Sequence, residues 1–374
     1  MDQQVARKLQ QIGKAFNIPG PFFSYEEITN GNVNRTYKVN YISDDGTGMA
    51  IVKPYLVQKL NSYAFHDPDK LMSNIDKVTE YIRAKRPHET CMHFHHTDVS
   101  GERKTYLEEN DSFWRIYKFI PAVTFDKCDD IEMIRSAGKA FGDFQTVLSD
   151  FDAAQLYETI PDFHNTRKRY ETLMKDVQED PCGRVSEVKE ELDFLMEVRN
   201  EACKLTDLYN AGKLPLRVTH NDTKINNVLF DEETHEPLVV IDLDTVMPGL
   251  VGNDFGDAIR FAANFEEEDS QNLDRVGVDL NIFWAFADGF LSQTATTLTD
   301  EEVDSLAASC FGITCELATR FLDDYIVGDK YFKVKKDKHN LLRTRTQIAL
   351  AKDMLVKMGA MQGIVRSCVE KYRA

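Results

Sequence analysis

Residues 220–227 read HNDTKINN, and residues 238–245 read LVVIDLDT. Short apolar runs at 218–220 and 238–243 lead directly into polar and acidic residues in both places. Strands that end in carboxylates present those acids at a cleft from a rigid element. The two stretches therefore predict an active site in the second part of the chain.

The first stretch has the spacing H-x-D-x-K-x-x-N, which is that of a kinase catalytic loop. Phosphoryl transfer needs a carboxylate beside the acceptor hydroxyl, metal ligands for the phosphates and positive charge against the developing negative charge. Asp222 is predicted to orient the hydroxyl and accept its proton, and Lys224 to reach the transferring phosphate. His220 is expected to orient the loop by hydrogen bonding rather than to react.

Asn227 and Asp242 are the predicted ligands of a Mg²⁺ ion, because carboxylate and amide oxygens suit a hard cation. Asp254 begins an Asp-Phe-Gly sequence like the metal motif of protein kinases, but it does not directly follow a buried strand. Asp254 and Asp257 are therefore expected to brace the catalytic loop by accepting its hydrogen bonds. Asp244 is left open as a second metal ligand or a supporting residue.

The composition bounds the class of protein. The chain has 374 residues, enough for two lobes, and its 62 acidic against 45 basic residues give a net charge of −17. This balance disfavours a nucleic-acid partner. The seven scattered cysteines form no C-x-x-C pair, and no apolar run reaches the length of a signal peptide or membrane span. We expect a cytoplasmic protein without a membrane partner.

The pattern predicts an α+β, bilobal fold with a small antiparallel-sheet lobe over residues 1–120 and a larger, mainly helical lobe over residues 121–374. Pro121 sets the boundary because it cannot donate to a sheet ladder. Strands are expected at 25–29, 35–41, 50–57, 91–96 and 113–119, and helices at 3–16, 70–85, 137–151 and 187–209.

Residues 29–37 connect two expected strands in the first lobe. Gly31 permits a tight turn there, and the exposed amides of such a loop can approach phosphates. Gly31, Asn32 and Asn34 are therefore the predicted contacts to ATP, with an ordinary hairpin turn as the alternative.

The motifs resemble the aminoglycoside phosphotransferase and choline kinase superfamily, whose fold is protein-kinase-like. Further stretches resemble the N-acetylhexosamine 1-kinases: WRIYKFI (114–120), FGDFQ (141–145), RVTHNDTK (217–224), IDLDTVMPG (241–249), DFGD (254–257) and NLLRTRTQ (340–347). The resemblance spans about residues 25 to 350. It implies ATP-dependent phosphorylation of the anomeric hydroxyl of N-acetylglucosamine or N-acetylgalactosamine, with ATP between the lobes and the sugar held by the larger lobe.

By the same resemblance, Asp222, Arg320 and Tyr331 contact the sugar, and Thr245 and Phe261 are weaker candidates. An arginine can offer two donors to sugar oxygens, and an aromatic face can pack on a pyranose ring. Core packing of the two aromatic rings and an internal salt bridge of the arginine are the alternatives.

Two positions depart from the related kinases. Asn32 stands where the family often has histidine, and Gln58 stands where protein kinases have a phosphate-binding lysine. Lys59 is expected on the opposite face of the same strand. Lys224 and Mg²⁺ are therefore expected to supply most of the positive charge.

Other readings remain open at this point. One alternative is that Asp222 and Asp242 only cap turns. Another is a non-catalytic nucleotide- or sugar-binding protein, which Gln58 alone favours. A regulatory metal site can be built on Cys91, His93, His95 and His96. Among kinases, the acceptor can be another sugar, an amino alcohol or an aminoglycoside.

Overall fold

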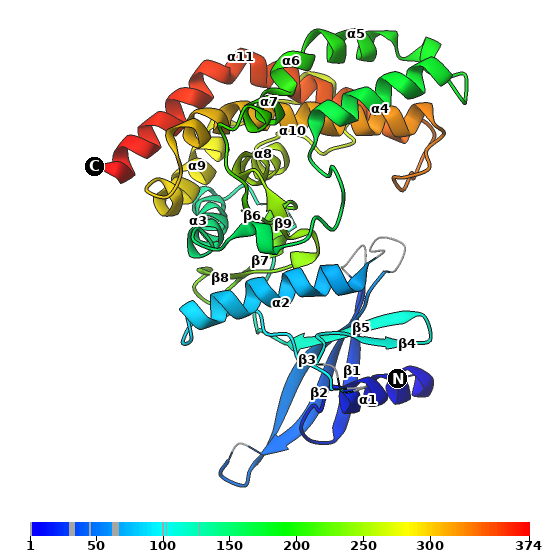
Figure 1. Cartoon of the computed structure of the whole chain (residues 1–374), viewed down its shortest axis with the longest axis vertical. Coiled ribbons are helices and arrows are strands. Elements are labelled where there is room, and N and C mark those ends of the chain that lie inside the picture. The colour runs from blue at the N-terminus through cyan, green and yellow to red at the C-terminus, as the bar shows by residue number, and fades with distance from the viewer. Residues whose placement is uncertain are drawn as a thin grey trace. The chain divides into compact units, whose positions relative to one another are not determined.

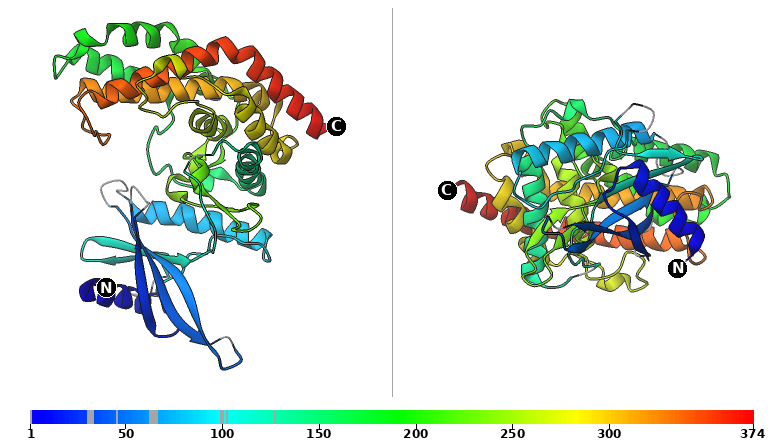
Figure 2. Two further views of the ribbon diagram at one scale, coloured as in Figure 1. Left: turned by 180° about the vertical axis from the view of Figure 1, so that it is seen from behind. Right: turned by 90° about the horizontal axis from the view of Figure 1, so that it is seen from below.

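The computed structural model describes residues 2–29, 34–44, 46–61, 67–98, 101, 103–126 and 128–374 (Figure 1). The chain divides into two compact units, Met1–Ala122 and Val123–Ala374. No helix in these described ranges is both long and apolar enough to cross a lipid bilayer. Figure 2 shows that the large sheet belongs to the blue and cyan first unit, whereas the second unit, green to red, is mainly helical.

The first unit is built on one five-stranded antiparallel sheet in the order β1-β2-β3-β5-β4. Its elements are α1 (Gln3–Ala15), β1 (Phe22–Ile28), β2 (Arg35–Asp44), β3 (Ala50–Lys59), α2 (Pro68–Lys85), β4 (Leu107–Glu109) and β5 (Ser112–Lys118). The antiparallel sheet with a helical second part confirms the predicted α+β class.

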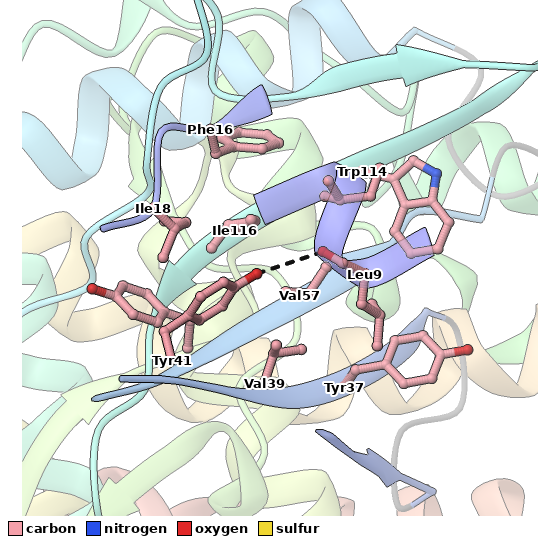
Figure 3. Close-up of a cluster of buried hydrophobic side chains, with 11 residues drawn as sticks. Leu9, Phe16, Ile18, Tyr37, Val39, Tyr41, Val57, Trp114 and Ile116 are labelled. Atoms are coloured by element: carbon pink, nitrogen blue, oxygen red, sulfur yellow. Dashed lines mark hydrogen bonds between the residues drawn. The ribbon is translucent and has the colours of Figure 1, made fainter. Parts of the chain in front are cut away.

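Alternation along the strands decides which helix covers which face of this sheet. Tyr37, Val39 and Tyr41 of β2 point to one face, where they form a buried cluster with residues of α1 (Figure 3). The Tyr41 hydroxyl donates to the Leu9 carbonyl of α1. Because successive side chains alternate, the neighbouring positions point to the opposite face.

Gln58 lies on that opposite face, paired across the strands with the buried Arg115. The Gln58 carbonyl oxygen accepts from Arg115 Nε at 2.9 Å, and a second Arg115 nitrogen contacts Met72 of α2. Lys59 lies over the ring of Trp114 on the α1 face, as predicted. The neutral side-chain amide of Gln58 is thus held by the Arg115 guanidinium within the sheet.

The predicted strand at 91–96 is wrong. Only Phe94 forms a bridge, to Tyr117 of β5, through a pair of backbone hydrogen bonds made by His93 and His95. One bridged residue does not continue into a ladder, so the segment runs along the sheet as irregular structure.

The second unit is built mainly of helices packed on one another. Its helices are α3 (Ile131–Val147), α4 (Thr166–Glu179), α5 (Lys189–Glu197), α6 (Arg199–Ala202), α7 (Lys204–Asn210), α8 (Val251–Ala262), α9 (Leu280–Thr294), α10 (Asp300–Ile326) and α11 (His339–Arg373). Helix α10 is apolar and buried nearly all round, as expected of a central helix packed by α4, α8 and α11. A Cβ at Gly256 of α8 would lie 2.8 Å from the Ser309 carbonyl oxygen, so only glycine allows this close approach.

One predicted helix is interrupted for a local reason, and the two expected short β-rich runs form strands. The expected helix over 187–209 is three short helices, because the backbone leaves helical geometry at Val198 and Cys203. The second unit also holds two short ribbons, β6 (Arg217–Thr219) with β9 (Met247–Gly249), and β7 (Val228–Phe230) with β8 (Pro237–Val240).

Helices α4 and α10 bring carboxyl groups together at Asp323. Burial, together with the negative charges of Asp176 and Asp324, raises the pKa of Asp323 to about 7, which Arg169 opposes. The unfolded value is about 3.9. The folded state therefore binds the proton of Asp323 more tightly than the unfolded state does. The stability that this protonation contributes is lost as the pH rises from about 4 to about 7.

We predict that Asp323→Asn stabilises the protein more at pH 8 than at pH 5, because asparagine mimics the protonated carboxyl. Thermal unfolding of the variant and the wild type at the two pH values measures the difference. Asp304→Asn on the exposed face of the same helix is the control. A pH-independent difference between Asp323→Asn and the wild type would contradict the prediction.

Candidate active site

The two motif stretches meet through the short ribbons of the second unit. Residues 220–227 run from β6 through a 3₁₀ turn, Ile225–Asn227, into β7. Strand β7 pairs with β8, and the N–H of Ile241 donates to the Asn227 carbonyl at 2.9 Å. The end of the loop and the start of the Asp242 stretch are therefore joined by a backbone hydrogen bond.

Asp222 sits at the centre of the loop with its carboxylate partly exposed. Lys224 Nζ lies 2.6 Å from one of its oxygens, and Asn227 Nδ2 donates to the other at 3.2 Å. Asn227 Nδ2 also donates to the Asp222 carbonyl at 2.8 Å. Both hydrogen bonds use the side-chain nitrogen of Asn227. Its side-chain oxygen, Oδ1, is therefore the atom left to face a cation.

His220 is fully buried and links both stretches. Its Nε2 donates to the Ile241 carbonyl at 2.8 Å, and its Nδ1 accepts from the Asp222 N–H at 3.3 Å. The ring lies edge-on to Phe141 and Phe144. A buried ring with both nitrogens engaged orients the loop, and this geometry supports the predicted role.

Asp254 lies beneath the loop on α8. Its carboxylate accepts the N–H of His220 at 2.9 Å, the N–H of Asn221 at 2.7 Å and Gln145 Nε2 at 2.7 Å. Burial raises the pKa of Asp254, while His220 and the backbone N–H groups oppose the rise. The acid is thus placed as a brace for the loop, as expected from its position away from a strand end.

The loop needs this brace because Asn221 has a positive φ of 63°. Asparagine tolerates this left-handed conformation, and its side chain donates to the Thr245 carbonyl at 2.9 Å. The Thr245 hydroxyl donates in turn to the His220 carbonyl at 2.6 Å. Thr245, proposed as a weak sugar contact, therefore has its hydroxyl engaged in holding the loop.

Asp257 does not brace the loop as predicted, because its hydrogen bonds come from Arg260, at 3.0 and 2.8 Å. Burial raises the pKa of Asp257, but Arg260 and Lys224 outweigh burial and lower it overall. Burial lowers the pKa of Lys224, but Asp222 and Asp257 raise it above its usual value. The ionised Asp257 therefore keeps Lys224 cationic beside Asp222.

Asp242 lies two residues after Val240, the last residue of β8, in an exposed, left-handed position with φ of 58°. Asp244, two residues later, is buried. The oxygens of Asn227 and Asp242 fit Mg²⁺, which usually takes one or two protein ligands and completes its shell with phosphates and water. In the described ranges no three His, Cys, Asp or Glu residues gather as a metal cluster.

The predicted sugar contacts gather at the end of α10. The Arg320 guanidinium lies 5.4–5.8 Å from the ring centres of Phe163, Tyr331 and Phe332. No ion pair of Arg320 occurs within the described part of the chain, so an internal salt bridge does not explain its place. Tyr331 is 72% exposed, which argues against core packing. Phe261 of α8 is only partly buried.

Two residues that the sequence gave no reason to single out connect the loop with Arg320. His164 Nδ1 lies 2.9 Å from the buried Glu316 of α10. Burial raises the pKa of Glu316, but His164 and Arg320 lower it overall, and His164 also lowers the pKa of Asp257. Electrostatic interactions therefore link Asp257 to His164 and Glu316 to Arg320, with the contact between His164 and Glu316 joining the two pairs.

The candidates in the first unit are covered only in part. Gly31 and Asn32 lie outside the described residues. Asn34 Oδ1 accepts the N–H of Asn61 at 3.0 Å. The nucleotide-contact prediction for this loop stays a prediction.

The alternative metal site at residues 91–96 finds no support. The rings of His93 and His95 stack with centres 5.0 Å apart, and burial lowers the pKa of His95 to about 4. His96 instead contacts Asp76, at 3.1 Å. These histidines pack on one another and on neighbouring residues rather than converging on an ion.

Comparison with known proteins adds a family and a fold. Residues 24–288 match the model of the phosphotransferase enzyme family. A solved microcompartment-associated aminopropanol kinase is 15% identical, with a TM-score of 0.61 over 96% of this chain and 99% of that one. An aminoglycoside phosphotransferase from Alicyclobacillus acidocaldarius is 13% identical, with a TM-score of 0.59 over 97% and 96%.

A spectinomycin phosphotransferase, solved with ADP and spectinomycin, is 13% identical, with a TM-score of 0.56 over 95% of this chain and 99% of that one. At such identities the likeness establishes the fold alone. It confirms the predicted protein-kinase-like fold class.

We predict that Asp254→Asn loosens the loop, because an amide nitrogen would then face a donor. Removing such a buried acceptor lowers the free energy of unfolding by about 1–3 kcal/mol. Denaturant unfolding measures the loss, and hydrogen exchange of the peptide covering 218–227 should become faster. Asp193→Asn on the exposed face of α5 is the control. Unchanged exchange in this peptide would show that Asp254 does not hold the loop.

Proposed function

Because this chain belongs to the phosphotransferase enzyme family, we propose that it is an ATP- and Mg²⁺-dependent kinase of N-acetylhexosamines. The acceptor is the anomeric hydroxyl of the sugar, and the products are the sugar 1-phosphate and ADP. The observation that carries this proposal is the convergence of Lys224 and Asn227 on the Asp222 carboxylate, with the Asp242 stretch joined to the same loop.

Asp222 supplies the base. Its carboxylate orients the sugar hydroxyl and accepts the proton as the hydroxyl oxygen bonds to the γ-phosphorus of ATP and the bond to ADP breaks. Lys224, held cationic by Asp222 and Asp257, offers positive charge to the phosphoryl oxygens. His220 and Asp254 keep the carboxylate in place and do not react.

Asn227 and Asp242 would hold the magnesium ion. When bound, Mg²⁺ neutralises charge on the phosphates of the nucleotide. The donor set supports this proposal, since one amide oxygen and one carboxylate leave most of the ion's coordination shell to phosphate and water.

The surroundings of Arg320 favour a neutral acceptor over an amine. Aromatic rings attract ammonium groups, but here Phe163, Tyr331 and Phe332 contact the chain's own guanidinium. The guanidinium nitrogens remain available to oxygens of an uncharged sugar. This supports a sugar rather than the aminopropanol or aminoglycoside that the solved relatives' names mention.

An ADP-release screen tests the proposal. N-acetylhexosamines, other sugars, aminopropanol, choline and aminoglycosides are compared at equal concentration, and phosphorus NMR assigns the phosphorylated position. We expect the highest kcat/KM with an N-acetylhexosamine and phosphate on its anomeric oxygen. ADP release with amines alone would reject the sugar assignment. No ADP release with any acceptor would favour a non-catalytic binding protein.

We predict that Asp222→Asn lowers turnover by about 10²- to 10⁴-fold, because the variant lacks the proton acceptor. ATP affinity, measured by calorimetry, should stay close to that of the wild type. Asp231→Asn in an exposed turn of the same unit is the matched control. Turnover at the wild-type rate would refute the role of Asp222 as base.

We predict that Asp242→Ala raises the Mg²⁺ concentration for half-maximal ADP release by about 10-fold or more, because a charged ligand is lost. A magnesium titration at fixed ATP measures the shift. Should Asp254→Ala shift the magnesium dependence while Asp242→Ala leaves it unchanged, the choice between the two acids is wrong.

A further inference from the structure

We propose that Asp324 and Asn340 are positioning residues that shape the acceptor loop, defined as residues 327–338 between α10 and α11, and thereby set acceptor affinity. The inference rests on the proposed function, because it treats Tyr331 of this loop and Arg320 beside it as acceptor contacts. It also gives a role to the NLLRTRTQ stretch, which the catalytic loop and the metal ligands leave unexplained.

Asp324 binds three consecutive backbone groups of the loop. Its Oδ1 accepts the N–H of Lys330 and of Tyr331, both at 2.8 Å, and its Oδ2 accepts the N–H of Phe332 at 3.0 Å. Asn340 Nδ2 donates to the same Oδ2 at 2.8 Å. Four donors fill the acceptor capacity of this carboxylate, which is only 3% exposed.

Asn340 lies fully buried in the first turn of α11 and ties that helix to the loop. Besides Asp324, its Nδ2 donates to Asp329 Oδ1 at 2.8 Å. Asp329 is itself held by Arg184, at 2.6 Å. The start of the loop is therefore bound from α10, from α11 and from the segment before α5.

The far end of the loop is bound by the residue next to Asn340. His339 Nδ1 accepts the N–H of Lys335 at 3.1 Å, and its Nε2 lies 2.8 Å from Asp269. Arg343, one turn along α11, donates to the Lys333 carbonyl at 3.3 Å. The beginning of the NLLRTRTQ stretch is thus a set of side chains that fastens this loop.

The hydrogen bonds that fasten the acceptor loop also affect the surroundings of Arg320. Arg320 and Asp324 are four residues apart on α10, so they lie one above the other on the same face of the helix. The carboxylate therefore holds Tyr331 and Phe332 directly beside the guanidinium, with Phe332 also packed on Phe321 at 4.6 Å between ring centres. The direction of the Arg320 donors depends on a loop whose backbone Asp324 fixes.

Asp324→Asn tests the proposal, because asparagine keeps one acceptor and turns an amide nitrogen toward the Phe332 and Asn340 donors. We expect the KM for the acceptor to rise about 10-fold, with kcat and the KM for ATP within about 2-fold of wild type. Trypsin should also cut faster at the exposed Lys330, Lys333 and Lys335. The control is Asp353→Asn, whose carboxylate accepts the Val278 N–H at 2.7 Å, in a different loop.

A double mutant separates positioning from general loosening. If Asp324 acts through Tyr331, then Asp324→Asn combined with Tyr331→Ala should raise the acceptor KM no more than Tyr331→Ala alone, within about 2-fold. Fully multiplicative effects, or an acceptor KM in Asp324→Asn equal to that of Asp353→Asn, would overturn the proposal. If Asp324→Asn does not fold, Asn340→Ala takes its place in the same cycle, with the same expected and contrary results.

Failure of the sugar assignment stays distinguishable from failure of this inference. If the wild type phosphorylates another acceptor, the same KM comparison and mutant cycle are run with that acceptor. If no acceptor is found, trypsin cleavage of the acceptor loop decides. Faster cleavage of this loop in Asp324→Asn than in Asp353→Asn supports the role of Asp324 in fastening the loop, and equal cleavage rates in the two variants overturn it.

Discussion

The buried carboxylate of Asp254 receives two successive backbone N–H groups, those of His220 and Asn221. A loop that turns through a left-handed residue directs these groups inward, where each needs an acceptor. Only with both satisfied can the loop project Asp222 outward with Lys224 and Asn227 against it. The face of the loop that carries Asp222 is therefore set from the buried side of the loop.

Helix α8 carries this support and extends it. Its close packing on α10 through Gly256 fixes the position of Asp254 beneath the loop. Asp257, three residues after Asp254 on the same helix, keeps Lys224 charged. Helix α10 carries Glu316, Arg320 and Asp324 at intervals of four residues. The two helices thus place the proposed phosphate-facing and acceptor-facing groups on one packed frame.

The sequence predicted best where the chemistry is local. Asp222, Lys224 and Asn227 share one eight-residue stretch, and Asp242 reaches it through a hairpin of two short strands, so spacing alone indicated their proximity. His164 and Glu316 were missed because they come from distant segments, and a polar residue on a long helix carries no local signal of its partner.

The errors have similar causes. Asp257 was expected to bind the loop, but a neighbouring Arg260 three residues away on the same helix takes its hydrogen bonds. The apolar and histidine-rich segment at 91–96 has the alternation of a strand, yet only Phe94 finds a bridge partner. Strand pairing depends on the register with a remote segment, which composition does not specify.

The arginine among Phe163, Tyr331 and Phe332 makes this face of α10 unlike an open aromatic cage. A tethered guanidinium is an intramolecular competitor whose effective concentration no dilution lowers. Any ammonium-bearing small molecule that seeks the same rings must first displace a side chain attached to the protein itself. If Arg320 lies in the acceptor site as proposed, this competition would disfavour amines already in the free protein, before any acceptor arrives.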